Sequence, residues 1–172
     1  MKKTTLIILI LLTGVISKSF GQKIEENHTD DFTGKSIKRT SWESLFSSSD
    51  GVAHFRVSKV GDDEMIDLKL MLGGKVFSIG KDDEMMLKLD DGEVVTIASS
   101  QTEITSKGAG ATGMNGSGAQ GVQVMYPITK DQATQLKAHK IAKVRIAYLD
   151  GTLDSDVNDK NATKLQLCFN FF

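Results

Sequence analysis

Three pairs of adjacent aspartates are the side chains of this sequence best suited to acid–base chemistry. Two carboxylates that converge on one bond can supply the general acid and the base or nucleophile of glycoside cleavage. Acidic pairs at turns are more often simply solvated, and nothing in the spacing of these pairs makes two of them converge. A small carboxylate-dependent hydrolase therefore stands as an alternative hypothesis. The pairs are Asp62/Asp63, Asp82/Asp83 and Asp90/Asp91.

The spacing D-x-D-x-N at Asp154, Asp156 and Asn158 is that of the start of a calcium-binding loop. Oxygen ligands at alternate positions can surround a hard cation. The rest of the motif is missing, because Asp159 stands where the loop needs glycine and Leu165 stands where it needs a bidentate glutamate. A strand end followed by a helix cap explains the same residues, so a weak metal site here is a minor hypothesis.

Residues 107–121 hold six of the sixteen glycines and match G-x-G-x-x-G twice. A dinucleotide site needs those glycines to leave a strand and open a helix. Here the pattern that follows is a strand, so no cofactor is predicted. We interpret the segment as a long surface loop that can contact a ligand or a partner. Its candidate binding residues are Gly108, Gly110, Gly113, Asn115 and Gly118.

The histidines and the single cysteine give weaker signals. His28, His54 and His139 are scattered and lack a ligand spacing such as H-x-x-x-H. Cys168 has no second cysteine to pair with, and its apolar neighbours predict a buried thiol rather than a nucleophile. No catalytic residue is predicted among them.

Short strands must position these side chains, because turn signals recur at the ~8–12-residue spacing of all-β layouts. Alternation of apolar and polar residues marks the strands, and pairs such as Asp91-Gly92 mark the hairpins. Residues 53–98 are predicted to form one antiparallel meander of about five strands. Strands are expected over residues 35–42, 53–60, 65–72, 76–79, 85–90, 94–97, 101–105, 122–126, 141–149 and 152–157.

Two helices are expected in the C-terminal third. Thr129 and Gln132 form a capping box for a helix that ends near residue 138. Asn158 or Asp159 caps a last helix, whose apolar residues recur at helical spacing. The predicted fold class is α+β: mainly an antiparallel β-meander sheet, with curled and sandwich-like arrangements both open, and two short helices.

Phe32, Trp42 and Phe46 form the only early aromatic group. Large rings usually anchor a core, and we expect these three to do so. Exposed rings at these positions would instead mark a contact surface.

The first 21 residues predict a cleaved secretory signal peptide. Lys2 and Lys3 precede an apolar run over residues 6–12, and Ser19-Phe20-Gly21 has small residues at the −3 and −1 positions. Gln22 is the expected new N-terminus, followed by a flexible segment over residues 22–31 and a single domain over residues 32–172. There is no cysteine near the cleavage site, so no lipid anchor is predicted.

Net charge excludes some partners of the predicted mature chain. Removal of Lys2, Lys3 and Lys18 from 21 basic residues leaves 18 against 22 acidic ones, a net charge of −4. This mildly acidic mixture argues against nucleic acid and against anionic lipid as partners. No second apolar stretch approaches the roughly 20 residues of a membrane span.

The junction Ser19-Phe20-Gly21-Gln22 and much of the body resemble small secreted or periplasmic proteins of Bacteroidetes-type bacteria. These relatives have no known activity, so the resemblance transfers no functional residue. The similar segments run from Phe32-Thr33-Gly34-Lys35 through Leu68-Lys69-Leu70, and include Leu87-Lys88-Leu89-Asp90-Asp91-Gly92, Tyr126-Pro127-Ile128-Thr129 and Lys143-Val144-Arg145-Ile146.

The leading functional hypothesis is a non-catalytic periplasmic or secreted binding protein. Its partner would be an envelope protein, a glycan or a small ligand, bound through a sheet face or the loop over residues 107–121. The alternatives are the small extracytoplasmic hydrolase and a self-assembling structural subunit of the envelope.

Overall fold

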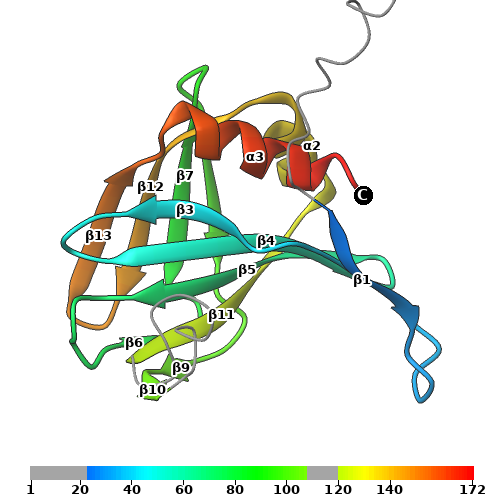
Figure 1. The fold of residues 1–172 in the computed structure, drawn as a ribbon, viewed down its shortest axis with the longest axis horizontal. Coiled ribbons are helices and arrows are strands. Elements are labelled where there is room, and N and C mark those ends of the chain that lie inside the picture. The colour runs from blue at the N-terminus through cyan, green and yellow to red at the C-terminus, as the bar shows by residue number, and fades with distance from the viewer. Residues whose placement is uncertain (1–22, 108–119) are drawn as a thin grey trace, which may run out of the picture.

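Antiparallel strands make up most of the computed structural model, which describes residues 23–107 and 120–172 (Figure 1). The predicted signal peptide and the five candidate residues of the glycine-rich loop lie outside these ranges. The elements are β1 (Ile24–Thr29), β2 (Ser36–Thr40), β3 (Glu43–Ser47), β4 (Val52–Val60), β5 (Asp63–Met71), β6 (Ser78–Ile79), β7 (Glu84–Leu89), β8 (Val94–Ala98), β9 (Glu103–Ile104), β10 (Ser106–Lys107), β11 (Gln120–Ile128), α2 (Lys130–Ala138), β12 (Ile141–Tyr148), β13 (Gly151–Asp156) and α3 (Asp159–Phe169).

The strands form two main sheets rather than one meander. The larger sheet has the order β1-β2-β4-β5-β11-β10, with β3 also paired to β4, and the second has the order β13-β12-β7-β8. A short pair, β6-β9, stands apart from both. The α+β class with two short helices near the C-terminus is confirmed. The single meander over residues 53–98 is wrong, because β5 pairs with β11 while β7 and β8 belong to the other sheet.

Alternation of side chains explains why each long strand has one core-facing side. In β5, Ile66, Leu68 and Leu70 are completely buried, and β7, β8 and β11 follow the same pattern. Full burial of such a side chain contributes about 1.5–3 kcal/mol. These inward residues fill a single hydrophobic core between the sheets.

Both predicted helices and their caps are confirmed. Thr129 accepts a hydrogen bond from the Gln132 amide and completes the capping box at α2. Asn158 caps α3 by accepting from the Asn161 amide at 2.9 Å. Helix α3 packs against β3 and β4 of the larger sheet and β12 of the second, so it joins the two sheets (Figure 1). Neither helix of the described chain has the length and apolar character needed to cross a bilayer.

Two N-terminal strands were missed by the sequence analysis. The segment expected to be flexible, residues 22–31, contains β1, which pairs with β2 over most of its length. Strand β3 pairs with β4 through a register shift, and that irregularity breaks the alternation on which sequence recognition depends.

The early aromatic residues do not share one environment. Phe46 is buried as expected, Trp42 is half-buried, and Phe32 is 99% exposed. The expectation that all three anchor the core is therefore wrong for Phe32. Phe32 lies in the turn between β1 and β2. That hairpin extends away from the rest of the molecule (Figure 1), which explains the exposure.

A polar cluster lies on the face of β4 and β5 that points away from the core. Asp67, only 3% exposed, accepts hydrogen bonds of 2.7 Å from both Arg56 Nε and Ser58 Oγ. The Trp42 ring lies beside it, with the Arg56 guanidinium 4.5 Å and the Lys69 ammonium 4.3 Å from the ring centroid. Arg56 contacts both the carboxylate and the ring, and we call this group the Asp67 cluster.

Candidate functional site

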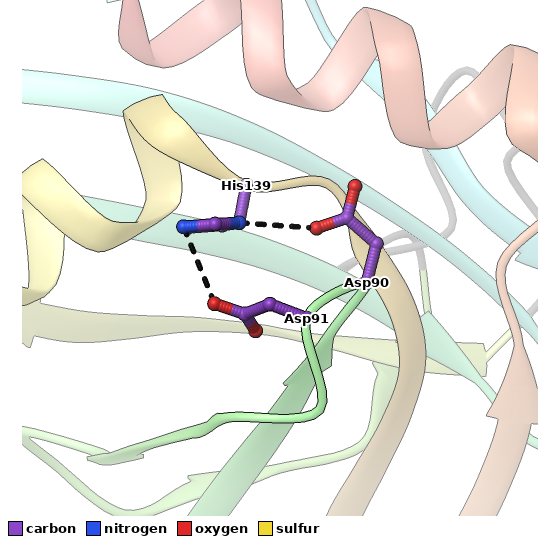
Figure 2. Close-up of side chains that lie close together, drawn as sticks. All are labelled: Asp90, Asp91 and His139. Carbon is purple, nitrogen blue, oxygen red and sulfur yellow. Dashed lines mark hydrogen bonds and ion pairs between the residues drawn. The ribbon is translucent and has the colours of Figure 1, made fainter.

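His139 lies between two carboxylates at the surface, and we call this group the His139 cluster (Figure 2). Its Nδ1 atom is 3.2 Å from Asp90 Oδ1, and its Nε2 atom is 3.2 Å from Asp91 Oδ2. The two aspartates occupy the turn after β7, whereas His139 is the residue that ends α2.

Backbone hydrogen bonds hold both halves of this cluster in place. The Asp90 amide donates to the Lys140 carbonyl at 2.9 Å, which joins the turn to the start of β12. Asp91 Oδ1 accepts from the Glu93 amide at 3.0 Å, so the other oxygen, Oδ2, faces the imidazole. Gly92, with φ of +95°, makes the tight turn possible.

The His139 cluster offers the donor set of a weak divalent-cation site. One ligand atom from each of the three residues lies within 4.8 Å of the others. Asp90 and Asp91 contact opposite ring nitrogens, so an ion bound to one nitrogen and its nearby aspartate would leave the other nitrogen to the remaining aspartate. An imidazole with both nitrogens protonated can donate to both carboxylates, so the same contacts also join the turn to the helix end without any metal ion.

Sequence reasoning missed this cluster for a physical reason. His139 and the aspartates are far apart in the chain and fit no ligand motif. The available signals were separate: a D-G hairpin turn, and a histidine at a helix C-terminus, where positive charge is favoured. Only the pairing of β7 with β12 brings them together.

The three aspartate pairs lie at three different turns. Asp62/Asp63 are exposed at the β4–β5 turn. Asp82/Asp83 precede β7 and Asp90/Asp91 follow it, so the six residues of β7 separate these two pairs by roughly 20 Å along the strand. These two pairs therefore do not form an acid and base across one bond.

The candidate calcium ligands all have partners. Arg145 on β12 donates to both oxygens of Asp154, at 2.6 Å each, and this pairing lowers the pKa of the Asp154 carboxyl. Lys143 lies 3.5 Å from Asp156, and Asn158 caps α3. A cation at this position would compete with Arg145 and with the helix cap. The calcium site stays a prediction.

A polar hollow of about 390 Å³ lies beside the β3–β4 turn and β13. Asp50 and Asp154 both line it. It is therefore the place to test the hydrolase hypothesis, although Arg145 keeps Asp154 in its ionised form.

A second hollow, of about 200 Å³, lies on the face of the β13-β12-β7-β8 sheet that points away from the core. We call it the outer hollow. Met86 and Val94 provide apolar surface there, and Val94 is 53% exposed. Lys88, Lys143 and Arg145 also line it. Most of the lining is apolar, and its charged side chains are mainly basic.

The β1–β2 hairpin, which we call the arm, extends from the larger sheet and ends in a hydrogen-bonded turn (Figure 1). Asp30 Oδ1 accepts hydrogen bonds from the amides of Phe32 at 3.1 Å and Thr33 at 2.6 Å, and from the Thr33 hydroxyl at 2.7 Å. These bonds lower the pKa of the Asp30 carboxyl. Residues 30–35 form the arm tip, where Phe32 stands free of any core.

Cys168 is completely buried, as the sequence predicts, and burial raises the pKa of its thiol to about 12. Such a thiol remains protonated and is a poor nucleophile.

Comparisons with protein-family models, with curated proteins and with solved structures give no match to this chain.

Proposed function

We propose that this chain is a non-catalytic extracytoplasmic binding protein that contacts a partner through the arm tip. Cleavage of the signal peptide over residues 1–21 would release it into the periplasm or the medium. The single observation that carries the binding role is Phe32, an aromatic side chain that is 99% exposed on a hydrogen-bonded turn.

An exposed phenylalanine contributes no burial free energy to the fold, so that energy is available to an interface. Its transfer from water to an apolar site contributes about 1.5–3 kcal/mol, which the free chain does not gain. Aromatic residues that become fully desolvated at the centre of an interface usually provide much of its binding energy.

The turn adds a second reason, because it fixes the backbone around Phe32 before binding. Asp30 holds the amides of Phe32 and Thr33, and the Gly34 amide donates to the Asp30 carbonyl at 2.8 Å. A partner therefore pays little conformational entropy to order this segment. A protein with an apolar depression suits such a tip better than a glycan, because a depression can enclose the whole ring whereas a sugar would cover only one of its faces.

The test is capture of cross-linked partners from the native cell envelope, with wild-type protein and Phe32→Ser in parallel. We expect Phe32→Ser to lose the specific partners. Leu149→Ser is the matched control, because Leu149 is 76% exposed but lies at the β12–β13 turn. The same set of partners for wild type and Phe32→Ser would refute a binding role for the arm tip.

Export has its own test. Expression of the full chain in its native host, followed by N-terminal sequencing of the envelope and secreted fractions, should give a mature protein that begins at Gln22. Protein found only in the cytosol with residues 1–21 retained would refute the proposed location.

A further inference from the structure

We propose that the partner of the arm tip is a second copy of this chain, whose outer hollow receives Phe32. This inference rests on the proposed function, because it names the partner for the same tip.

The size and polarity of the outer hollow suit one aromatic ring. Its volume is about 200 Å³, and Met86 and Val94 give it apolar walls. An apolar cavity of roughly 150 Å³ is enough to hold benzene. Val94 is 53% exposed in the single chain, so a ring placed there would cover apolar surface on both molecules.

The outer hollow has three basic side chains against one acidic one, Asp154, whereas the arm tip has two aspartates against Lys35, so the two surfaces differ in the sign of their net charge. Asp31, exposed beside Phe32, has no ion pair among the described residues, and the same is true of Lys88 in the outer hollow. Lys88 lies directly opposite Lys143 in the β7–β12 register. Lys143 already has the Asp156 carboxylate within 3.5 Å, whereas Lys88 has no such partner in the described part of the chain, so a carboxylate placed beside Lys88 gains an attraction without breaking an existing ion pair. Asp31 of a second copy can supply this carboxylate.

One copy cannot fill its own outer hollow. The arm is at one edge of the larger sheet, whereas the outer hollow is on the second sheet (Figure 1). Each copy would therefore give its tip to one neighbour and receive the tip of another. Such a heterologous contact builds rings or open chains rather than two-fold dimers. A tip in a shallow hollow covers little area, so the association is weak and concentration-dependent.

Analytical ultracentrifugation of the exported protein over a concentration series tests this proposal. Wild type should form a ladder of oligomers as its concentration approaches about 1 mM. Phe32→Ser removes the tip contact and Val94→Glu blocks the outer hollow, so each variant alone should stay monomeric. Leu149→Ser should assemble like wild type. Unchanged melting temperatures would show that the variants are folded, and Lys88→Asp is a second way to block the hollow.

Mixing the two monomeric variants is the decisive measurement. Phe32→Ser retains an intact hollow and Val94→Glu retains an intact tip, so the mixture should give a 1:1 dimer that cannot grow. Charge reversal provides an independent test. Asp31→Lys and Lys88→Asp should each weaken assembly at least tenfold, and their combination in one chain should restore most of it.

Three results would overturn the proposal: a wild-type protein that is monomeric at about 1 mM, assembly that persists in Phe32→Ser, or a mixture that gives no dimer. If wild type is monomeric but still captures another envelope protein through Phe32, the proposed function holds and only self-assembly fails. If no contact depends on Phe32, both fail.

Discussion

The Asp67 cluster and the His139 cluster contain similar charged groups in opposite surroundings. Asp67 is 3% exposed and accepts hydrogen bonds from Arg56 and Ser58, and the Arg56 guanidinium in turn lies over the Trp42 ring. Asp90 and Asp91 are exposed, and water reaches both of them and the half-buried His139. The first cluster bridges two central strands of the larger sheet, and the second joins a turn to a helix end. The difference in burial leads us to expect that breaking one ion pair or the other costs very different amounts of stability.

The physical reason is the cost of removing charge from water. A buried carboxylate that loses its partners cannot be hydrated, so the penalty for breaking the pair is large. A surface ion pair exchanges its partner for water at little cost, and dissolved salt screens the attraction.

The largest expected effect follows from breaking the Asp67 cluster. Asp67→Ala leaves Arg56, which is largely covered, without its carboxylate, and should lower the free energy of unfolding by about 3 kcal/mol. Urea unfolding followed by tryptophan fluorescence measures this directly, because Trp42 is the only tryptophan and belongs to the cluster. Ser58→Ala, which removes one hydrogen bond, should cost only about 1 kcal/mol. A fall in the free energy of unfolding of less than about 1 kcal/mol for Asp67→Ala would contradict the expected difference between the Asp67 and His139 clusters.

An intermediate effect should appear at alkaline pH, where buried neutral groups resist ionisation. Burial raises the pKa of Cys168 from 9.0 to about 12 and also raises the pKa of Tyr126 above its ordinary value. The unfolded chain then releases protons at a lower pH than the folded chain does, so stability is complete below pH 9 and falls as pH rises towards 12.

Cys168→Ala separates the two contributions to this pH dependence. Between pH 9 and 11 its free energy of unfolding should fall less steeply than that of wild type, and the remaining slope belongs to Tyr126 and other titrating groups. The comparison uses slopes, because loss of the sulfur also changes packing at all pH values. Identical slopes for the two proteins would show that the Cys168 thiol is not shielded from water.

The smallest expected effect follows from breaking the His139 cluster. His139→Ala should lower the free energy of unfolding by less than about 1 kcal/mol at low salt, and the difference should shrink in about 1 M salt. Chemical denaturation at the two salt concentrations measures both values, with Lys88→Ala as a control for loss of an exposed charge on a neighbouring element. A loss above about 2 kcal/mol that salt does not reduce would mean that this cluster is shielded like Asp67.

Local structure was largely predictable because its causes are local. Alternation in β4, β5 and β7 depends on neighbouring residues, and the cap of α2 depends on Thr129 and Gln132 three positions apart. The burial of Cys168 follows from the apolar residues beside it in α3. The weakest strand predictions were residues 76–79 and 101–105, which shrink to the two-residue strands β6 and β9.

The candidate surfaces were not predictable in the same way. Phe32 is a large apolar residue of the kind usually found in a core. Its position at a hairpin tip depends on β1, which the sequence analysis did not recognise. The outer hollow combines side chains of three strands, β7, β8 and β12, with Asp154 of a fourth. No window of sequence contains such a set.

The sequence by itself therefore determined the α+β class, most strand positions, both helices and the burial of the thiol, because side-chain alternation and capping act between near neighbours. Tertiary structure alone decided that β5 pairs with β11, that His139 meets Asp90 and Asp91, and that Phe32 stays in water. Each of these depends on long-range strand pairing, whose free energy comes from the whole core rather than from any local pattern.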